Sequence, residues 1–431
     1  MGLIMKKTAN FGKKGLFLII YTALLMFICG CVNSGMTQTV IPAIAENNGW
    51  NSSVMLSWIT YGSWIGVITC ALWGQLVLKK GAKLVAVIGL AGGGLAIALY
   101  GYAPTLPLLC LAIVLNRVFS TAYQNNAANT LITNWFPRKK GIAFGWATMG
   151  IIFVDIIWLT MITAGMNTIG LGPSLLIVTA VFFILAAIGL IWVKNTPEEA
   201  NTFPDNDPSP EGIKEIERSL QEMRNYKSPW TVKRMLRQKS VWFASFGIGL
   251  LWLASIGTIS QNVPRLTSLG YEQANAVTIV SISAIFALLG SWAFGKIDTV
   301  FGTKRACQIY SAVQVIALCA YLLQGAGIVF VWIACILMYS CTGGIANLAP
   351  SMIGTLFGRK DFAAANRLMN PWIYAIYSTS FLLISACLSL FGSYDSAYIL
   401  FIALTVIGFG LVCAVNVNEI KERSKTLGEK S

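Results

Sequence analysis

Long apolar runs alternate with short polar turns along almost the whole chain. A transmembrane helix needs about 20 apolar residues to cross the hydrocarbon core. Twelve runs reach that length and predict helices at 16–40, 53–77, 83–102, 106–132, 141–164, 172–193, 241–263, 274–295, 304–324, 328–354, 364–389 and 396–417. We therefore expect an all-α polytopic membrane protein.

The two halves of the chain repeat each other at an offset of 221 positions. The repeated positions include Gly74, Gly81 and Lys83, which recur as Gly295, Gly302 and Lys304. This predicts two pseudo-symmetric six-helix bundles at 1–193 and 241–417, a cytoplasmic linker at 194–240 and a cytoplasmic tail at 418–431. A duplicated polytopic bundle is typical of secondary transporters, whose site lies between the repeats.

Composition agrees with a lipid-facing surface. Hydrophobic residues make up 56% of the chain and charged residues 11%, against about 25% charged in soluble domains. The net charge of +14 could suggest a nucleic-acid partner. However, all but two of the Lys and Arg residues lie in the termini, in alternate loops or at the adjoining span ends. The basic loops are 78–82, 133–140, 296–303 and 355–363.

This distribution follows the positive-inside rule. It predicts a multi-pass plasma-membrane protein, in a prokaryotic inner membrane, with both termini cytoplasmic and no nucleic-acid partner. The two exceptions are Arg117, deep inside a span, and Arg265, in a loop on the opposite side.

The residue inventory offers little for catalysis. The chain has no histidine and ten cysteines, nearly all within apolar runs. No cysteine spacing is typical of a metal site. We expect no metal, no cofactor and no catalytic residues, and therefore not an enzyme.

The linker contains one amphipathic pattern. Ser209-Pro210 is typical of a helix start, and apolar residues follow at helical spacing as far as Met223. This predicts a helix on the cytoplasmic surface. A simple linker helix and a regulatory or partner-binding helix remain as alternatives.

The loop after the second predicted span carries a family resemblance. Its sequence Gly74-Gln-Leu-Val-Leu78-Lys-Lys-Gly81-Ala-Lys83 resembles the signature loop of the major facilitator superfamily. Leu78 replaces the acid of that signature. In the second copy an acid, Asp298, stands one position early. The resemblance implies a twelve-helix transporter fold and a conformational latch, whose residues here would be Gly74, Gly81, Lys83, Gly295, Asp298, Gly302 and Lys304.

A second loop resembles one branch of that superfamily. Residues 134–145 are similar to the loop between spans four and five of monocarboxylate and oxalate–formate antiporter-like members, and Arg117 stands where many members carry an arginine. Oxalate–formate relatives use basic residues in spans eight and eleven to bind a dicarboxylate, whereas here span eight has none and span eleven has only Arg367, near its cytoplasmic start. A dianion is therefore disfavoured, and a monocarboxylate, a zwitterion or an amphipathic organic acid stays open.

Charges inside a span are costly and indicate function. Arg117 in the fourth span and Asp155 in the fifth lie at similar depth, so the two can pair. Asp155 would then be a proton-binding carboxylate, or Arg117 would contact an anionic solute. A static ion pair that braces two helices is the alternative.

Other polar side chains within spans are candidates for substrate contact or coupling. They are Gln124, Asn125, Gln38, Tyr61, Gln261, Asn347, Asn370 and Tyr374. Pro42 and Pro264, near the ends of the first and seventh spans, can interrupt their helices.

We therefore expect a secondary active transporter of a small organic solute that works by alternating access. Its expected partners are the solute, a proton and the lipid bilayer, and it would function as a monomer by proton-coupled symport. A solute/solute exchanger (antiporter) or efflux carrier is the alternative within transport. A non-transporting membrane sensor is the alternative from another class.

Overall fold

The computed structural model describes residues 11–137, 139–209, 214 and 230–428, which are helical and carry no strand. Apart from Ser209 and Lys214, the predicted linker helix lies outside these described residues. Twelve helical spans are long and apolar enough to cross a membrane, and each coincides with one of the twelve predicted runs. The predicted fold class is confirmed.

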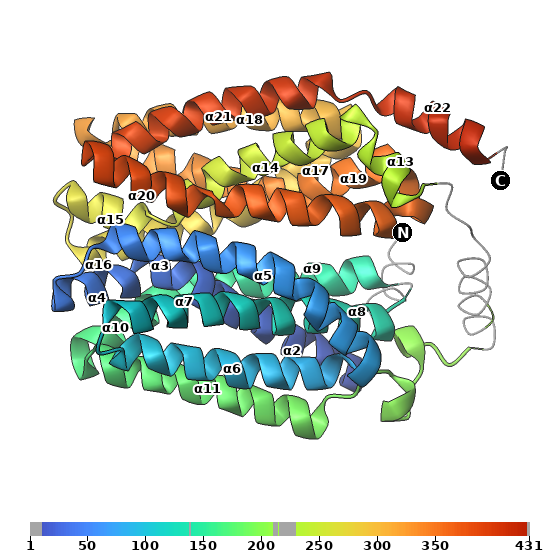
Figure 1. The fold of residues 1–431 in the computed structure, drawn as a ribbon, viewed down its shortest axis with the longest axis horizontal. Coiled ribbons are helices and arrows are strands. Elements are labelled where there is room, and N and C mark those ends of the chain that lie inside the picture. Colours follow the sequence, from blue (N-terminus) through green and yellow to red (C-terminus); the bar gives the residue numbers. More distant parts are fainter. Residues whose placement is uncertain (1–10, 138, 210–213, 215–229, 429–431) are drawn as a thin grey trace. The chain divides into compact units, whose positions relative to one another are not determined.

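The chain divides into two compact units, shown together in Figure 1. Unit 1 comprises Met1–Trp50 and Tyr61–Arg224, and unit 2 comprises Asn51–Thr60 and Asn225–Ser431. The first turns of α5 belong to unit 2, where Thr60 donates to the carbonyl of Ser378 at 2.9 Å.

Unit 1 contains the first six spans. Its helices are α2 (Gly12–Gly30), α3 (Met36–Gln38), α4 (Val40–Asn48), α5 (Ser52–Lys80), α6 (Ala82–Tyr102), α7 (Leu106–Ser120), α8 (Asn129–Trp135), α9 (Lys140–Phe153), α10 (Leu159–Ile169) and α11 (Leu171–Trp192). Helix α6 packs against both α7 and α11, and α2 packs against α9 (Figure 1).

Unit 2 contains the other six. Its helices are α13 (Val232–Leu236), α14 (Lys239–Ile259), α15 (Asn262–Ser268), α16 (Gln273–Ala284), α17 (Phe286–Phe301), α18 (Thr303–Leu322), α19 (Ile328–Ser378), α20 (Ser380–Phe391), α21 (Tyr394–Ala414) and α22 (Val417–Gly428). Helix α14 packs against α19 and α21, and α19 also packs against α17 and α18.

Three predicted loops are shorter than expected. Helix α5 continues through Lys80 and α17 through Phe301, so a single glycine joins each of them to the next helix. These are the repeated Gly81 and Gly302, with φ of 88° and 83°. Only glycine adopts such a conformation without a steric penalty. The expected loop 355–363 is likewise a break at Gly358 within the long helix α19.

The two prolines mark matching helix breaks. The backbone leaves the helical region at Thr39, three residues before Pro42. It does so again at Gln261, three residues before Pro264. A proline ring obstructs the preceding turn of a helix, so both spans end in a short second helix, α4 and α15.

Candidate functional site

Three π-helical segments interrupt the spans of unit 1. They are η1 (Cys31–Gly35) after α2, η2 (Thr121–Ala128) after α7, and η3 (Val154–Trp158) after α9. Segment η1 contacts η3, and η2 packs against α2. Among the described residues of unit 2 no π-helical segment occurs. Such segments are rare and frequently mark functional sites, so they identify the centre of unit 1 as the candidate site.

Arg117 lies in the last turn of α7, directly before η2. Its side chain is buried, with 6% of its surface exposed. Its Nη2 donates to the carbonyl oxygen of Asn33 in η1 at 2.9 Å. The neighbouring Asn116 donates to the carbonyl of Val32 at 3.2 Å. The π-helical turn of the first span therefore presents two backbone carbonyls to the fourth span.

A chain of side-chain contacts links the same segments. Asn33 donates to the sulfur of Cys29 at 3.0 Å. The thiol of Cys29 in turn donates to Gln124 of η2 at 3.1 Å. The amide oxygen of Asn33 is buried without a partner among the described residues. The predicted residue Gln124 thus joins Arg117 in one polar cluster, whereas Cys29 was expected only to fill space.

The fifth span approaches the first very closely. A Cβ on Gly30 would lie 2.4 Å from Val154, and one on Gly35 would lie 2.3 Å from Trp158. Both glycines therefore allow η3 to contact η1. Asp155 follows Val154 in η3, the segment that contacts η1. The side chain of Asp155 lies outside the described residues, as does the expected pair with Arg117.

The remaining predicted residues of unit 1 differ in their burial. Gln38 is buried in α3, at the end of the first span. Asn125 is half-buried in η2. Tyr61 is 37% exposed, with its ring 5.9 Å from that of Trp64.

In unit 2, aromatic rings and amides take the place of charges. Trp252 stacks on Tyr377 at 5.0 Å, and Tyr374 meets Tyr377 edge-on at 4.8 Å. Gln261 is buried and accepts a hydrogen bond from Tyr394 at 3.3 Å.

Two predicted amides of unit 2 are exposed. Asn347 uses its amide to join α19 to Ser291 of α17, at 2.7 Å from the hydroxyl. Asn370 is also exposed on α19.

Asp298 connects three helices at one end of unit 2. Its carboxylate accepts from Thr303 at 2.6 Å and from Ser351 at 2.5 Å, so α17, α18 and α19 meet there. Lys304 donates to the carbonyl of Val415 at 2.9 Å, beyond the end of α21. The predicted latch residues of the second copy therefore hold adjacent helix ends.

Unit 1 holds the equivalent ends through the start of the linker. Leu78, which replaces the signature acid, is 88% exposed. Asn195 instead accepts from the backbone N–H of Lys83, at 2.9 Å, at the start of α6. The buried Asp205 accepts from the N–H of Lys139, at 2.9 Å, at the start of α9. The sequence pattern gave no indication of these two linker residues.

The position of Arg265 differs from the one expected from the sequence. It does not lie in a loop but on helix α15, with 7% of its surface exposed. Its Nη2 is 2.6 Å from Oδ1 of Asp395. The counter-charge stands 130 residues away, at the start of α21, so local sequence could not reveal the pair.

The sequence profile of the Major Facilitator Superfamily matches residues 23–378. That range covers most of the chain and both units. The chain belongs to this superfamily.

Two relatives are transporters by name. The "Probable anion transporter 3, chloroplastic" of Arabidopsis thaliana is 27% identical over 44% of this chain and 36% of its own length. The chain therefore matches about a third of that relative. The "Uncharacterized MFS-type transporter YhjX" of Escherichia coli is 22% identical over 69% of each chain.

Solved structures support the same fold. The nucleoside transporter NupG matches 92% of this superfamily member with a TM-score of 0.67 and 15% identity. A bacterial homologue of the human lysosomal transporter Spinster matches 95% with a TM-score of 0.64 and 14% identity. The protein is thus a twelve-span membrane protein of a solute-transporter superfamily.

Proposed function

We propose that this protein is a secondary active transporter of a small organic acid, with a monocarboxylate as the preferred class. The observation that carries the proposal is Arg117, a buried cation within a span, set among three π-helical segments. A guanidinium stays charged at any physiological pH. Burying it is costly without an opposite charge nearby. An anionic solute would form an ion pair with this guanidinium on binding.

Asp155 is the proposed partner of Arg117 when no solute is bound. Its segment η3 contacts η1, whose Asn33 carbonyl accepts from Arg117. A carboxylate that alternates between a proton and Arg117 would couple solute binding to proton binding. This arrangement supports proton symport, in which solute and proton enter together and the buried charge stays balanced.

The number of negative charges on the proposed solute follows from the distribution of basic residues. Relatives that carry dianions use basic residues in spans eight and eleven; here the eighth predicted span has none and the eleventh has only Arg367, near its start. The stacked Trp252 and Tyr377 in unit 2 form an aromatic surface that carries no charge. The name of the Arabidopsis relative, an anion transporter, supports the same class. We therefore propose a monocarboxylate carrier, in agreement with the branch of the superfamily that residues 134–145 resemble.

The remaining parts of the proposal concern the cycle and its setting. The two units would alternate access to the solute. The helix ends held by Asp298 in unit 2, and by Asn195 and Asp205 in unit 1, would act as latches. The basic loops orient both termini towards the cytoplasm of a prokaryotic cell.

A ligand screen on the purified protein tests the proposal. We expect monocarboxylates to raise the melting temperature more than dicarboxylates, amino acids or betaines do. Arg117→Gln should raise the Kd of the best ligand by at least about tenfold, equivalent to about 1.4 kcal/mol of binding free energy. Arg237→Gln, at an exposed arginine before α14, is the matched control. Equal ligand affinity in Arg117→Gln and the parent protein would exclude Arg117 as the anion contact.

A further inference from the structure

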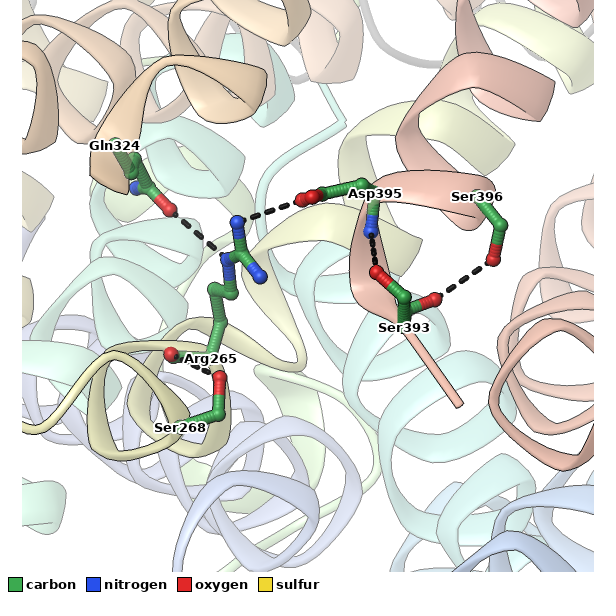
Figure 2. A network of polar contacts seen from close by, with 6 residues as sticks. All are labelled: Arg265, Ser268, Gln324, Ser393, Asp395 and Ser396. Carbon is green, nitrogen blue, oxygen red and sulfur yellow. Dashed lines mark hydrogen bonds and ion pairs between the residues drawn. The ribbon is translucent and has the colours of Figure 1, made fainter. Parts of the chain in front are cut away.

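A second buried cation stands at the other end of unit 2 from Asp298. Arg265 of α15 is surrounded by η6 (Gln324–Ala326) and the start of α21 (Figure 2). Its guanidinium carbon lies 5.6 Å from the ring of Tyr398 and 6.0 Å from that of Tyr394. Nothing in the proposed transport site around Arg117 uses this cluster.

The guanidinium of Arg265 is only partly satisfied. Nη2 bonds one carboxylate oxygen of Asp395 at 2.6 Å, and Nε makes a long 3.4 Å bond to Gln324. Nη1 has no acceptor among the described residues. In Figure 2 the third nitrogen points away from both partners. Arginine–carboxylate pairs are frequently bidentate, with two parallel hydrogen bonds. The Arg265–Asp395 pair has only one of these two hydrogen bonds.

Further donors in the same cluster lack acceptors. The side-chain nitrogens of Asn262 and Gln324 are buried without a partner in the described part of the chain. Tyr321 already occupies the amide oxygen of Asn262 at 2.6 Å, and its ring lies 5.0 Å from that of Tyr398. Unsatisfied buried donors are costly. Asn262 and Gln324 therefore each keep a buried donor without an acceptor, while Asp395 engages Arg265 through only one of its two carboxylate oxygens.

The two members of the ion pair differ in their access to water. The side chain of Asp395 is 49% exposed, whereas that of Arg265 is 9% exposed. Water can hydrate the carboxylate if it leaves, but the guanidinium stays buried and needs an anion. Asp395 is therefore the exchangeable partner.

We propose that Arg265, with Gln324 and Asn262, forms a carboxylate-binding site in which Asp395 is the built-in occupant. The carboxylate of a small monovalent organic acid displaces Asp395 and bonds Arg265 through two nitrogens. A role for this site in binding the transported solute rests on the proposed transport of organic acids. By the positive-inside rule, the site would face the exterior. Its existence as a binding site does not depend on Arg117.

The test uses acetate as the probe, in full-length protein that carries Arg117→Gln to remove the other proposed anion contact. Thermal stability is measured against sodium acetate and against sodium chloride at equal ionic strength, because salt screens charge pairs. A bound ligand raises stability in proportion to the logarithm of its concentration over Kd. We expect stabilisation by acetate that chloride does not reproduce.

Three variants in this background define the site. Asp395→Asn removes the tethered competitor, whose effective concentration is in the millimolar range or above, and should lower the apparent Kd for acetate about tenfold. Arg265→Gln should abolish the acetate response. Gln324→Glu adds a second tethered carboxylate and should raise the apparent Kd for acetate. This variant tests the proposal even if Asp395→Asn folds poorly.

Two kinds of result would overturn the proposal. An acetate response that persists in Arg265→Gln, or that is unchanged in both Asp395→Asn and Gln324→Glu, would make the pair a static brace between α15 and α21. Equal responses to chloride and acetate would exclude a carboxylate site. Either result leaves the proposed role of Arg117 standing, because Arg117 is already replaced in every sample.

Discussion

A charged side chain inside a membrane-spanning helix is costly to expose to lipid, so it contacts polar groups within the protein or a bound ligand. One contact of Arg117 is with the carbonyl of Asn33 in a π-helical turn. A carbonyl can hold the guanidinium in place, but it carries no net charge. The proposed coupling rests on a change of charge around Arg117, either by binding of an anion or by protonation of Asp155.

Replacing Asp155 by asparagine tests the coupling at its centre. The amide keeps the shape of the side chain but cannot bind or release a proton. We expect Asp155→Asn to retain exchange of solute across proteoliposomes while uptake driven by an imposed pH gradient falls at least about tenfold. Initial rates of both processes, measured on the same preparation, give the comparison.

Glu46→Gln is the matched control for this change. Glu46 is an exposed carboxylate of α4, away from the π-helical segments, and its neutralisation should leave gradient-driven uptake unaltered. If Asp155→Asn keeps its full pH dependence, Asp155 does not carry the proton.

At the scale of helices, glycines determine how closely α17 and α19 approach. A Cβ on Gly343 would lie 1.9 Å from the carbonyl of Ala287, and one on Gly290 would lie 2.1 Å from that of Ser340. Small residues commonly allow such close crossings in membranes. We expect Gly343→Ala to force the helices apart and to cost about 1–3 kcal/mol, measured as a lower melting temperature in detergent.

Gly410→Ala is the control for that substitution. Gly410 lies within α21 and has no atom within 4 Å of the position of a Cβ. Alanine there should be neutral or stabilising by about 0.5–1 kcal/mol, since glycine weakens a helix interior. Equal melting temperatures for the two variants would show that the crossing of α17 and α19 tolerates a methyl group.

The linker contact at the start of α6 leads to a separate prediction. Asn195→Ala removes the acceptor for the N–H of Lys83, and loss of such a cap costs about 0.5–2 kcal/mol. Asn195→Asp should preserve or improve stability, because a negative charge is favourable at a helix N-terminus. Asn48→Ala, at an exposed residue that bonds within its own helix, is the control. No loss of stability in Asn195→Ala would show that this cap is dispensable.

The sequence predicted the elements that depend on local chemistry. Apolar runs gave all twelve spans, because each helix needs a lipid-compatible length. Pro42 and Pro264 indicated breaks that the backbone shows at Thr39 and Gln261. The repeated Gly81 and Gly302 marked turns that require positive φ. In each case the physical cause lies within a few residues of its effect.

What the sequence did not predict depends on distant partners. A π-helical turn differs from an α-helical one by a single residue in its hydrogen-bond spacing, so η1, η2 and η3 leave the apolar pattern unchanged. Asn195 and Asp205 come from the linker, and Asp395 reaches Arg265 across 130 residues. For the candidate site, the pattern selected Arg117 and Gln124 but gave no role to Cys29.

For the whole molecule, the duplicated halves have become chemically different. Unit 1 holds the cation within a span and the π-helical segments, while unit 2 offers aromatic rings and amides at its centre. Its own buried cation, Arg265, stands near a helix end and already has a carboxylate beside it. The two copies of the repeat therefore differ in where they place buried charge.

Transport by the intact protein decides between symport and exchange. Proteoliposomes without internal solute are given a pH gradient, acidic outside, and labelled ligand from the screen. For a symporter we expect uptake that collapses when a protonophore removes the gradient, because each solute anion enters with a proton. An exchanger would instead take up label only after preloading with unlabelled solute, whatever the pH gradient. Uptake that needs preloading would therefore refute proton symport and leave Arg117 as the anion contact of an exchanger.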